Sequence, residues 1–303
     1  MLRRGIVAFG FGAALVGVGL DGSSSVPSAD QAVAVHTSDL PAPAPPSTPP
    51  TSSHGSSTGA GPSTASSANA LLSQSIEWQF GGKPQRGWYL YTPLVQGLIG
   101  TDADLQSDEF AKAVKRWQRK HRITPANGAI GAAVWEAMFT ELQRARSFST
   151  VPPPAAELVE VPGSEWLFQE RPAELRQLRR DAYEAYARMV RAARSELGET
   201  PSCDFFQLIS GYRSREYQEE LRLREGGNPS SAALAKNSPH FSGRAIDLYV
   251  GGDPVSTKDE NRAVQVATPA YRWLVKHAHH YGFRPYFYEP WHWEYDPSLD
   301  RKR

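Results

Sequence analysis

Between residues 71 and 148 the hydrophobic residues recur with a helical period. Phe110, Val114 and Trp117 fall at i, i+4 and i+7 and line one face of a predicted helix, with basic residues on its other faces. After a turn at Asn127 and Gly128, a second predicted helix carries the apolar residues Val134, Trp135, Met138 and Phe139. The pattern predicts a small all-helical module over residues 71–148.

The C-terminal part of the chain mixes helical and extended patterns. Apolar residues from 175 to 197 recur with mostly helical spacing and predict a long helix, and residues 271–281 predict another. Short apolar runs at 205–209 and 286–295 predict extended segments. Helices together with a few separated strands favour an α+β domain, which we place at residues 172–303.

The N-terminal part of the chain has few residues to bury. Two arginines precede an apolar run at residues 5–20, which is typical of an export signal, and we assign residues 1–34 to it. A retained membrane anchor is the alternative. Residues 35–70 are rich in Pro, Ser, Thr, Ala and Gly and predict a disordered tether. Residues 149–171, which begin with a proline run, predict a second linker.

Charge and cysteine content exclude two classes of function. Lys and Arg number 33 against 32 Asp and Glu, and this balance gives no basic surface for nucleic acid. Cys203 is the single cysteine, so the chain cannot form an internal disulfide or hold a metal through several thiolates. A metal ion would have to be bound by histidine and carboxylate groups.

Separated histidine and carboxylate residues form a candidate metal site. A catalytic zinc ion takes three protein ligands and keeps a further position open, and His240, Asp247 and His292 provide such a set. Glu289, three residues before His292, is the candidate general base for an attacking water. The guanidinium of Arg213 suits either a developing oxyanion or a substrate carboxylate.

Two motifs resemble those of the VanY-type D-alanyl-D-alanine carboxypeptidases, zinc peptidases that share a fold with D,D-dipeptidases and Hedgehog signalling domains. The first motif has Ser238, His240, Gly243, Ala245 and Asp247 at its fixed positions, and the second is Glu-Pro-Trp-His at 289–292. A Ser-Gly-Tyr-Arg-Ser segment at 210–214 also matches the family. The resemblance covers residues 175–296 and implies a small antiparallel sheet with flanking helices.

The resemblance also implies roles for single residues. The implied zinc ligands are His240, Asp247 and His292. Glu289 is implied to be the general base, and Arg213 to hold the substrate or the transition state. The predicted substrate contacts are Arg213, Gln218, Ser238 and Trp291. For Trp291 the alternative is packing on the sheet.

A second resemblance concerns the helical module. Residues 94–142, with Gln118, Gly128 and Gly131 among the matching positions, resemble the peptidoglycan-binding domain often attached to wall hydrolases. The resemblance implies that the module attaches the enzyme to the wall and takes no part in the chemistry. The alternative is an ordinary amphipathic helical hairpin with a solvated basic face.

These observations predict a zinc-dependent peptidase of peptidoglycan stem peptides, a D-alanyl-D-alanine carboxypeptidase. Two alternatives remain open: a peptidoglycan endopeptidase, and a non-catalytic wall-binding protein with structural zinc. Export predicts a location in the periplasm or cell envelope, or secretion, with no stable membrane insertion after signal cleavage. Specificity for D,D- or L,D-bonds is left open by the sequence.

Overall fold

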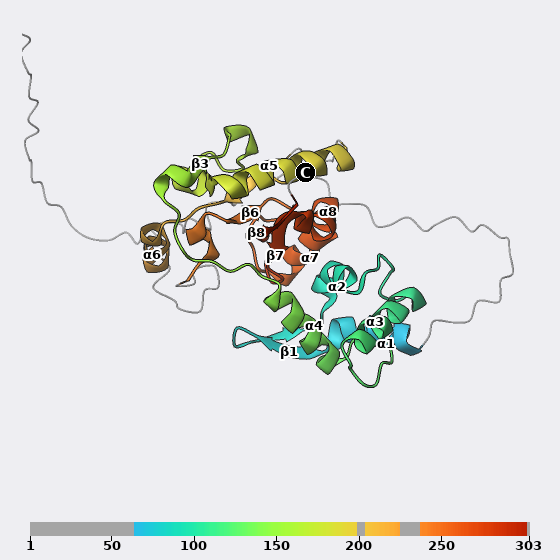
Figure 1. Ribbon diagram of the computed structural model, residues 1–303. Helices are drawn as coiled ribbons and strands as arrows, with labels where there is room; N and C mark the ends of the chain where they lie inside the picture. The colour runs from blue at the N-terminus through green and yellow to red at the C-terminus, as the bar shows by residue number, and fades with distance from the viewer. Residues whose placement is uncertain (1–63, 199–203, 225–236, 302–303) are drawn as a thin grey trace, which may run out of the picture. The chain divides into compact units, whose positions relative to one another are not determined.

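The computed structural model describes residues 64–198, 204–224 and 237–301 of the chain (Figure 1). The predicted export signal, Cys203 and most of the predicted tether lie outside these ranges. In the described part of the chain, no helix is both long and apolar enough to cross a bilayer.

The N-terminal module contains helices and one β-hairpin. Its elements are α1 (Thr64–Ser75), β1 (Glu77–Phe80), β2 (Lys83–Arg86), the 3₁₀ turn η1 (Tyr89–Tyr91), α2 (Thr92–Ile99), α3 (Asp108–Lys120) and α4 (Ala132–Arg144). Helices α3 and α4 confirm the two predicted helices, but the prediction of an all-helical module is wrong. Gly81 and Gly82 join β1 to β2 with φ of 56° and 74°, the left-handed backbone that a two-residue hairpin turn requires.

Helix α1 corrects the C-terminal boundary of the predicted tether. Asn69, which is fully buried, donates from Nδ2 to the carbonyl of Gly128 at 3.0 Å and accepts from the amide of Ile130 at 2.9 Å. Residues 64–70 therefore belong to the module. Their small polar side chains form no apolar stripe, and for this reason the local pattern did not indicate a packed helix.

The predicted linker is also wrong over most of its length. Strand β3 (Leu158–Glu160) pairs in antiparallel fashion with β4 (Gln177–Arg179), and the side chains of Val161 and Trp166 are buried. This segment also contains the 3₁₀ turns η2 (Ala155–Glu157) and η3 (Gly163–Glu165), and η4 (Ala173–Arg176) precedes β4. Residues 155–171 are part of the C-terminal domain.

The C-terminal domain confirms the predicted α+β class. Its four-stranded antiparallel sheet has the order β5 (Leu208–Ser210), β6 (Ala245–Leu248), β8 (His292–Asp300) and β7 (Tyr281–Pro285). The flanking helices and turns are α5 (Arg180–Leu197), α6 (Arg215–Arg224), η6 (Pro239–Ser242), α7 (Asp259–Ala267), α8 (Pro269–His277) and η7 (Ala278–His280). Helix α5 contacts β7 and β8 (Figure 1). It begins at Arg180 rather than 175, and Tyr281 begins a strand rather than ending a helix.

The module and the C-terminal domain share one aromatic cluster. Phe287, which is 2 % exposed, lies in the loop before Glu289, and its ring centroid is 4.8 Å from that of Phe80 and 4.9 Å from that of Phe139. Arg262 of α7, also 2 % exposed, donates to the hydroxyl of Tyr91 in the module at 3.0 Å. All described residues fall in one compact unit. The module therefore packs on the C-terminal domain.

Candidate metal centre

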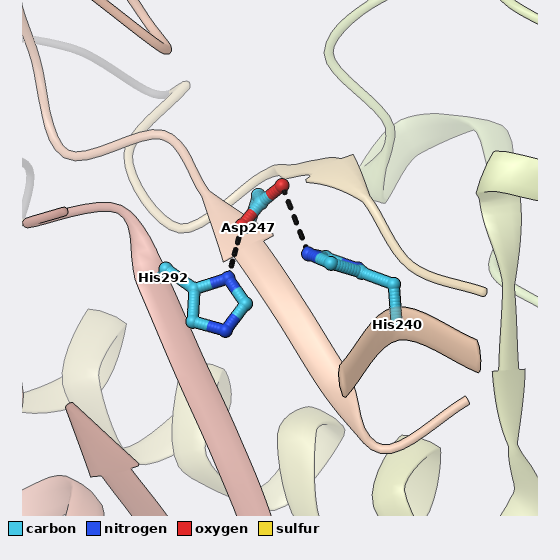
Figure 2. A group of neighbouring side chains, drawn as sticks. All are labelled: His240, Asp247 and His292. Carbon is cyan, nitrogen blue, oxygen red and sulfur yellow. Dashed lines mark hydrogen bonds and ion pairs between the residues drawn. The ribbon is translucent and has the colours of Figure 1, made fainter. Parts of the chain in front are cut away.

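Three buried side chains converge on one point of the C-terminal domain. One candidate ligand atom from each of His240, Asp247 and His292 lies within 4.8 Å of the other two. Figure 2 shows both imidazoles directed at the carboxylate of Asp247. Nδ1 of His292 lies 2.8 Å from Oδ1 of Asp247, and Nε2 of His240 lies 3.3 Å from Oδ2. The structure thus brings together the three predicted metal ligands.

The sheet and one sharp turn place these residues. Asp247 on β6 and His292 on β8 are direct cross-strand partners, so their side chains are neighbours. His240 lies on η6, which ends at Gly243 with φ of 66°. A Cβ on Gly243 would lie 3.0 Å from the backbone nitrogen of Arg179, which donates to the Gly243 carbonyl at 2.8 Å. The glycine of the motif therefore permits both the turn and the close approach of β4.

The outer nitrogen of each imidazole faces an oxygen atom. Nδ1 of His240 lies 2.6 Å from the carbonyl oxygen of Gly211, and Nε2 of His292 lies 3.4 Å from Oε1 of Glu294. Binding of a metal by the inner nitrogens, those beside Asp247, requires the protons to sit on these outer nitrogens, where the two oxygens can accept them. The lone pairs then belong to Nε2 of His240 and Nδ1 of His292, the two nitrogens beside Asp247. Two imidazole nitrogens and a carboxylate oxygen in this arrangement fit a zinc ion.

Electrostatics differ between the two histidines. Burial lowers the pKa of His240 to about 4. Burial also works against the charged form of His292, but hydrogen bonds to Asp247 and Glu294 outweigh it and raise the pKa of His292 to about 9. The same histidines overcome the effect of burial on Asp247 and hold the pKa of its carboxyl well below the usual value. Without a metal, a charged imidazole therefore pairs with the Asp247 carboxylate.

The predicted base and guanidinium both interact with the predicted ligands. Burial raises the pKa of Glu289, whose carbonyl accepts from the His292 amide at 2.9 Å. A carboxylate with a raised pKa is a stronger base. Arg213 donates from Nη2 to Oδ2 of Asp247 at 3.0 Å and from Nε to Oγ of Ser210 at 3.0 Å. Glu289 lies in the loop between β7 and β8, and its carboxyl interacts electrostatically with His292, Asp247 and Arg213.

Comparison with known proteins assigns this part of the chain. Residues 175–298 match the family model of the VanY D-alanyl-D-alanine carboxypeptidases. This segment is a VanY-family domain. It contains every residue that the sequence predicts for the site. A comparison with proteins of curated function found no match to the chain.

Two solved structures are similar to part of the chain. One is of the LdcB LD-carboxypeptidase, with 25 % identity over 47 % of this chain and 68 % of that chain, and a TM-score of 0.36. Its description refers to the molecular basis of peptidoglycan recognition. The other is a mutant of the vancomycin-resistance D,D-pentapeptidase VanY in complex with Zn(II), with 21 % identity over 45 % of this chain and 82 % of that chain, and a TM-score of 0.26.

The predicted substrate contacts of the VanY-family domain are largely buried. Oγ of Ser238 accepts from the amide of His240 at 3.3 Å and so caps η6. Gln218 in α6 is 2 % exposed and Trp291 is 3 % exposed. Their contacts with a substrate stay predictions.

Two residues beside the predicted metal ligands were missed by the sequence analysis. Glu294 follows His292 by two positions on β8, and the two-residue period of a strand puts both on one face, a signal that was available. Arg146, which ion-pairs with Glu294, lies outside the residues that match the VanY family. Its local sequence carries no signal, because the contact joins segments that are distant along the chain.

Proposed function

We propose that the chain is a zinc-dependent peptidase that removes the terminal D-alanine from peptidoglycan stem peptides. The observation that carries this proposal is the buried His240, Asp247 and His292 group beside Glu289, within a domain that matches a carboxypeptidase family. The family match supports a peptidase of peptidoglycan. The zinc ion, the carboxypeptidase specificity and the residue roles are the further content of the proposal.

The residues divide the hydrolysis into separate tasks. His240, Asp247 and His292 would hold zinc, which supplies a Lewis acid for the scissile carbonyl and lowers the pKa of water to about 7. Glu289 takes a proton from the attacking water and then gives it to the leaving amine as the peptide C–N bond breaks. Arg213 donates hydrogen bonds to the developing oxyanion or to the substrate carboxylate.

The position of Glu289 favours catalysis over a purely structural zinc site. A structural site needs four protein ligands and no base, whereas three ligand residues and one carboxyl with a raised pKa meet here. We further propose that the protein is exported to the periplasm or cell envelope, or secreted. In this proposal residues 71–148 contribute to peptidoglycan binding.

Digestion of purified muropeptides tests the proposal. The full-length zinc-loaded protein is incubated with pentapeptide, tetrapeptide and cross-linked muropeptides, and the products are weighed by mass spectrometry. Loss of one D-alanine from the pentapeptide is expected. Loss from the tetrapeptide alone would indicate L,D-specificity, and cleavage of the cross-link would indicate an endopeptidase. Bound zinc with no cleavage of any substrate would favour the structural alternative.

Metal content provides the matching control. Wild-type protein is expected to carry about one zinc ion per chain, and His240→Ala much less, because one of three ligands is lost. Elemental analysis of both proteins measures this difference. Equal zinc in the two proteins would refute the assignment of the site.

A further inference from the structure

One ion pair connects the end of the N-terminal module to the candidate metal centre. Arg146 lies two residues beyond α4, and its Nε and Nη2 both donate to Oε1 of Glu294, the former at 3.1 Å. The side chain of Glu294 is 1 % exposed and that of Arg146 is 19 % exposed. The guanidinium also lies 4.0 Å from the ring centroid of Tyr286, so the arginine is held from two directions.

The same carboxylate oxygen faces a predicted metal ligand. Oε1 of Glu294 lies 3.4 Å from Nε2 of His292. The opposite nitrogen of that ring, Nδ1, points at Asp247 and is the one available to a metal. An oxygen on the outer nitrogen of a histidine ligand fixes the tautomer and the orientation of the ring. Arg146, Glu294 and His292 thus form a continuous polar chain that ends at the metal centre.

We propose that Arg146 is a positioning residue of the metal centre, acting on His292 through Glu294. The inference rests on the proposed function, because it requires His292 to bind zinc. A buried carboxylate without its cation must recruit water or another partner, and it then no longer holds a defined position. Arg146 prevents this by directing two donors at the oxygen that faces His292. The metal centre therefore includes a residue from outside the VanY-family match.

The affinity of the full-length protein for Zn²⁺ measures this role directly. Metal-free wild type and variants are titrated with Zn²⁺ in competition with a chromogenic chelator, so the readout does not depend on turnover. Loss of an outer partner of a metal ligand weakens metal binding by about 10- to 100-fold, and this loss is expected for Arg146→Ala and for Glu294→Gln. In the double variant the two losses should not add, because Arg146 acts through Glu294.

The chain offers a matched control. Arg188 of α5 donates to both carboxylate oxygens of Asp300 at 2.7 Å, and the side chain of Asp300 is likewise 1 % exposed. Arg188→Ala therefore breaks a comparable ion pair that has no contact with the metal ligands. It is expected to lower the melting temperature and to leave zinc affinity at the wild-type value.

Each outcome decides between the hypotheses. If wild type itself binds no zinc, the proposed function fails. If wild type binds zinc and Arg146→Ala binds it equally well, or if the losses in the double variant add fully, the positioning role is wrong. Should Arg146→Ala not fold, Arg146→Gln replaces it, since glutamine keeps a donor and part of the stem but removes the charge. Wild-type zinc affinity in a folded Arg146→Gln protein would equally overturn the inference.

Discussion

Replacement of Phe287 by alanine tests whether packing of the module on the C-terminal domain supports the stability and the activity of that domain. Besides Phe80 and Phe139, the ring of Phe287 contacts that of Tyr91, with centroids 5.4 Å apart. Burial of a phenylalanine side chain stabilises by about 1.5–3 kcal/mol, and each aromatic pair adds about 0.5–1.5 kcal/mol. Burial and three such pairs together give about 3–7.5 kcal/mol. Truncation of a buried phenylalanine usually costs about 3–5 kcal/mol, so we expect Phe287→Ala to lose ~4 kcal/mol of unfolding free energy.

The position of Phe287 predicts an effect on catalysis as well. It precedes Glu289 by two residues, and the loop is closed by hydrogen bonds from the Tyr286 amide to the His292 carbonyl at 3.0 Å and from the Glu289 amide to the Tyr286 carbonyl at 3.3 Å. A loss of ~4 kcal/mol changes the docking equilibrium by almost a thousandfold. The loop that carries Glu289 would then lose its contact with the module.

Urea unfolding of the full chain and turnover of a soluble stem peptide measure the two effects. Unfolding is followed by tryptophan fluorescence, since Trp78 lies 6.4 Å from Phe287 between ring centroids. Phe206→Ala is the control: this phenylalanine is 1 % exposed and packs on Trp273 inside the C-terminal domain. Both variants should lose stability, but only Phe287→Ala should lose turnover under conditions where the protein is folded.

The reasoning is refuted if Phe287→Ala unfolds within about 1 kcal/mol of wild type and keeps full turnover. The sequence alone predicts unchanged stability and turnover, because its patterns indicate a wall-binding module joined to the catalytic domain by a linker. Sedimentation of the same variant with insoluble wall sacculi separates the two functions of the module. An intact wall-binding surface with reduced turnover would show that the module both binds and supports catalysis.

Three further predictions concern single residues. Glu289→Gln should retain zinc while turnover falls at least about a hundredfold, and near-normal turnover with zinc bound would exclude it as the base. The pKa of His292 is about 9 in the metal-free protein, so zinc binding at pH 7 should release about one proton, and zinc affinity should rise with pH up to about 9. Calorimetry in buffers of different ionisation enthalpy measures the number of protons released. Zinc binding without proton release would contradict this prediction. Asn69→Ala leaves the buried Gly128 carbonyl and Ile130 amide unpaired, and each unpaired group should lower the free energy of unfolding by about 1–3 kcal/mol. An unchanged melting temperature would contradict the assignment of α1 to the module.

The sequence was most informative where chemistry restricts residue type. The ligand set and Glu289 are recognisable because zinc chemistry needs these groups and the motif spacing is specific. The patterns predicted two extended segments, and the resemblance implied a small antiparallel sheet. Its register, which the structure supplies, explains why Asp247 and His292, distant in the chain, become neighbours. Gly243 is recognisable as one of the fixed positions of the first motif.

The errors share a physical origin in contacts between distant segments. Strand β3 has only three residues, and its pairing with β4 is decided by partners beyond a loop rather than by its own pattern. Helix α1 is held by Asn69 through polar contacts, which a search for apolar periodicity does not detect. The β1–β2 hairpin is an exception, because Gly81-Gly82 between two short runs is a recognised turn signal that was overlooked.

The shared aromatic cluster also determines the order in which the chain can complete its folding. Phe287 and Arg262 are synthesised after Phe80 and Tyr91, which belong to the first described segment. Synthesis proceeds from the N-terminus, so the aromatic face of the module stays uncovered until residue 287 has emerged. During this interval exposed aromatic surface favours aggregation, and a chaperone that keeps the nascent chain apart from others would raise the yield of folded protein.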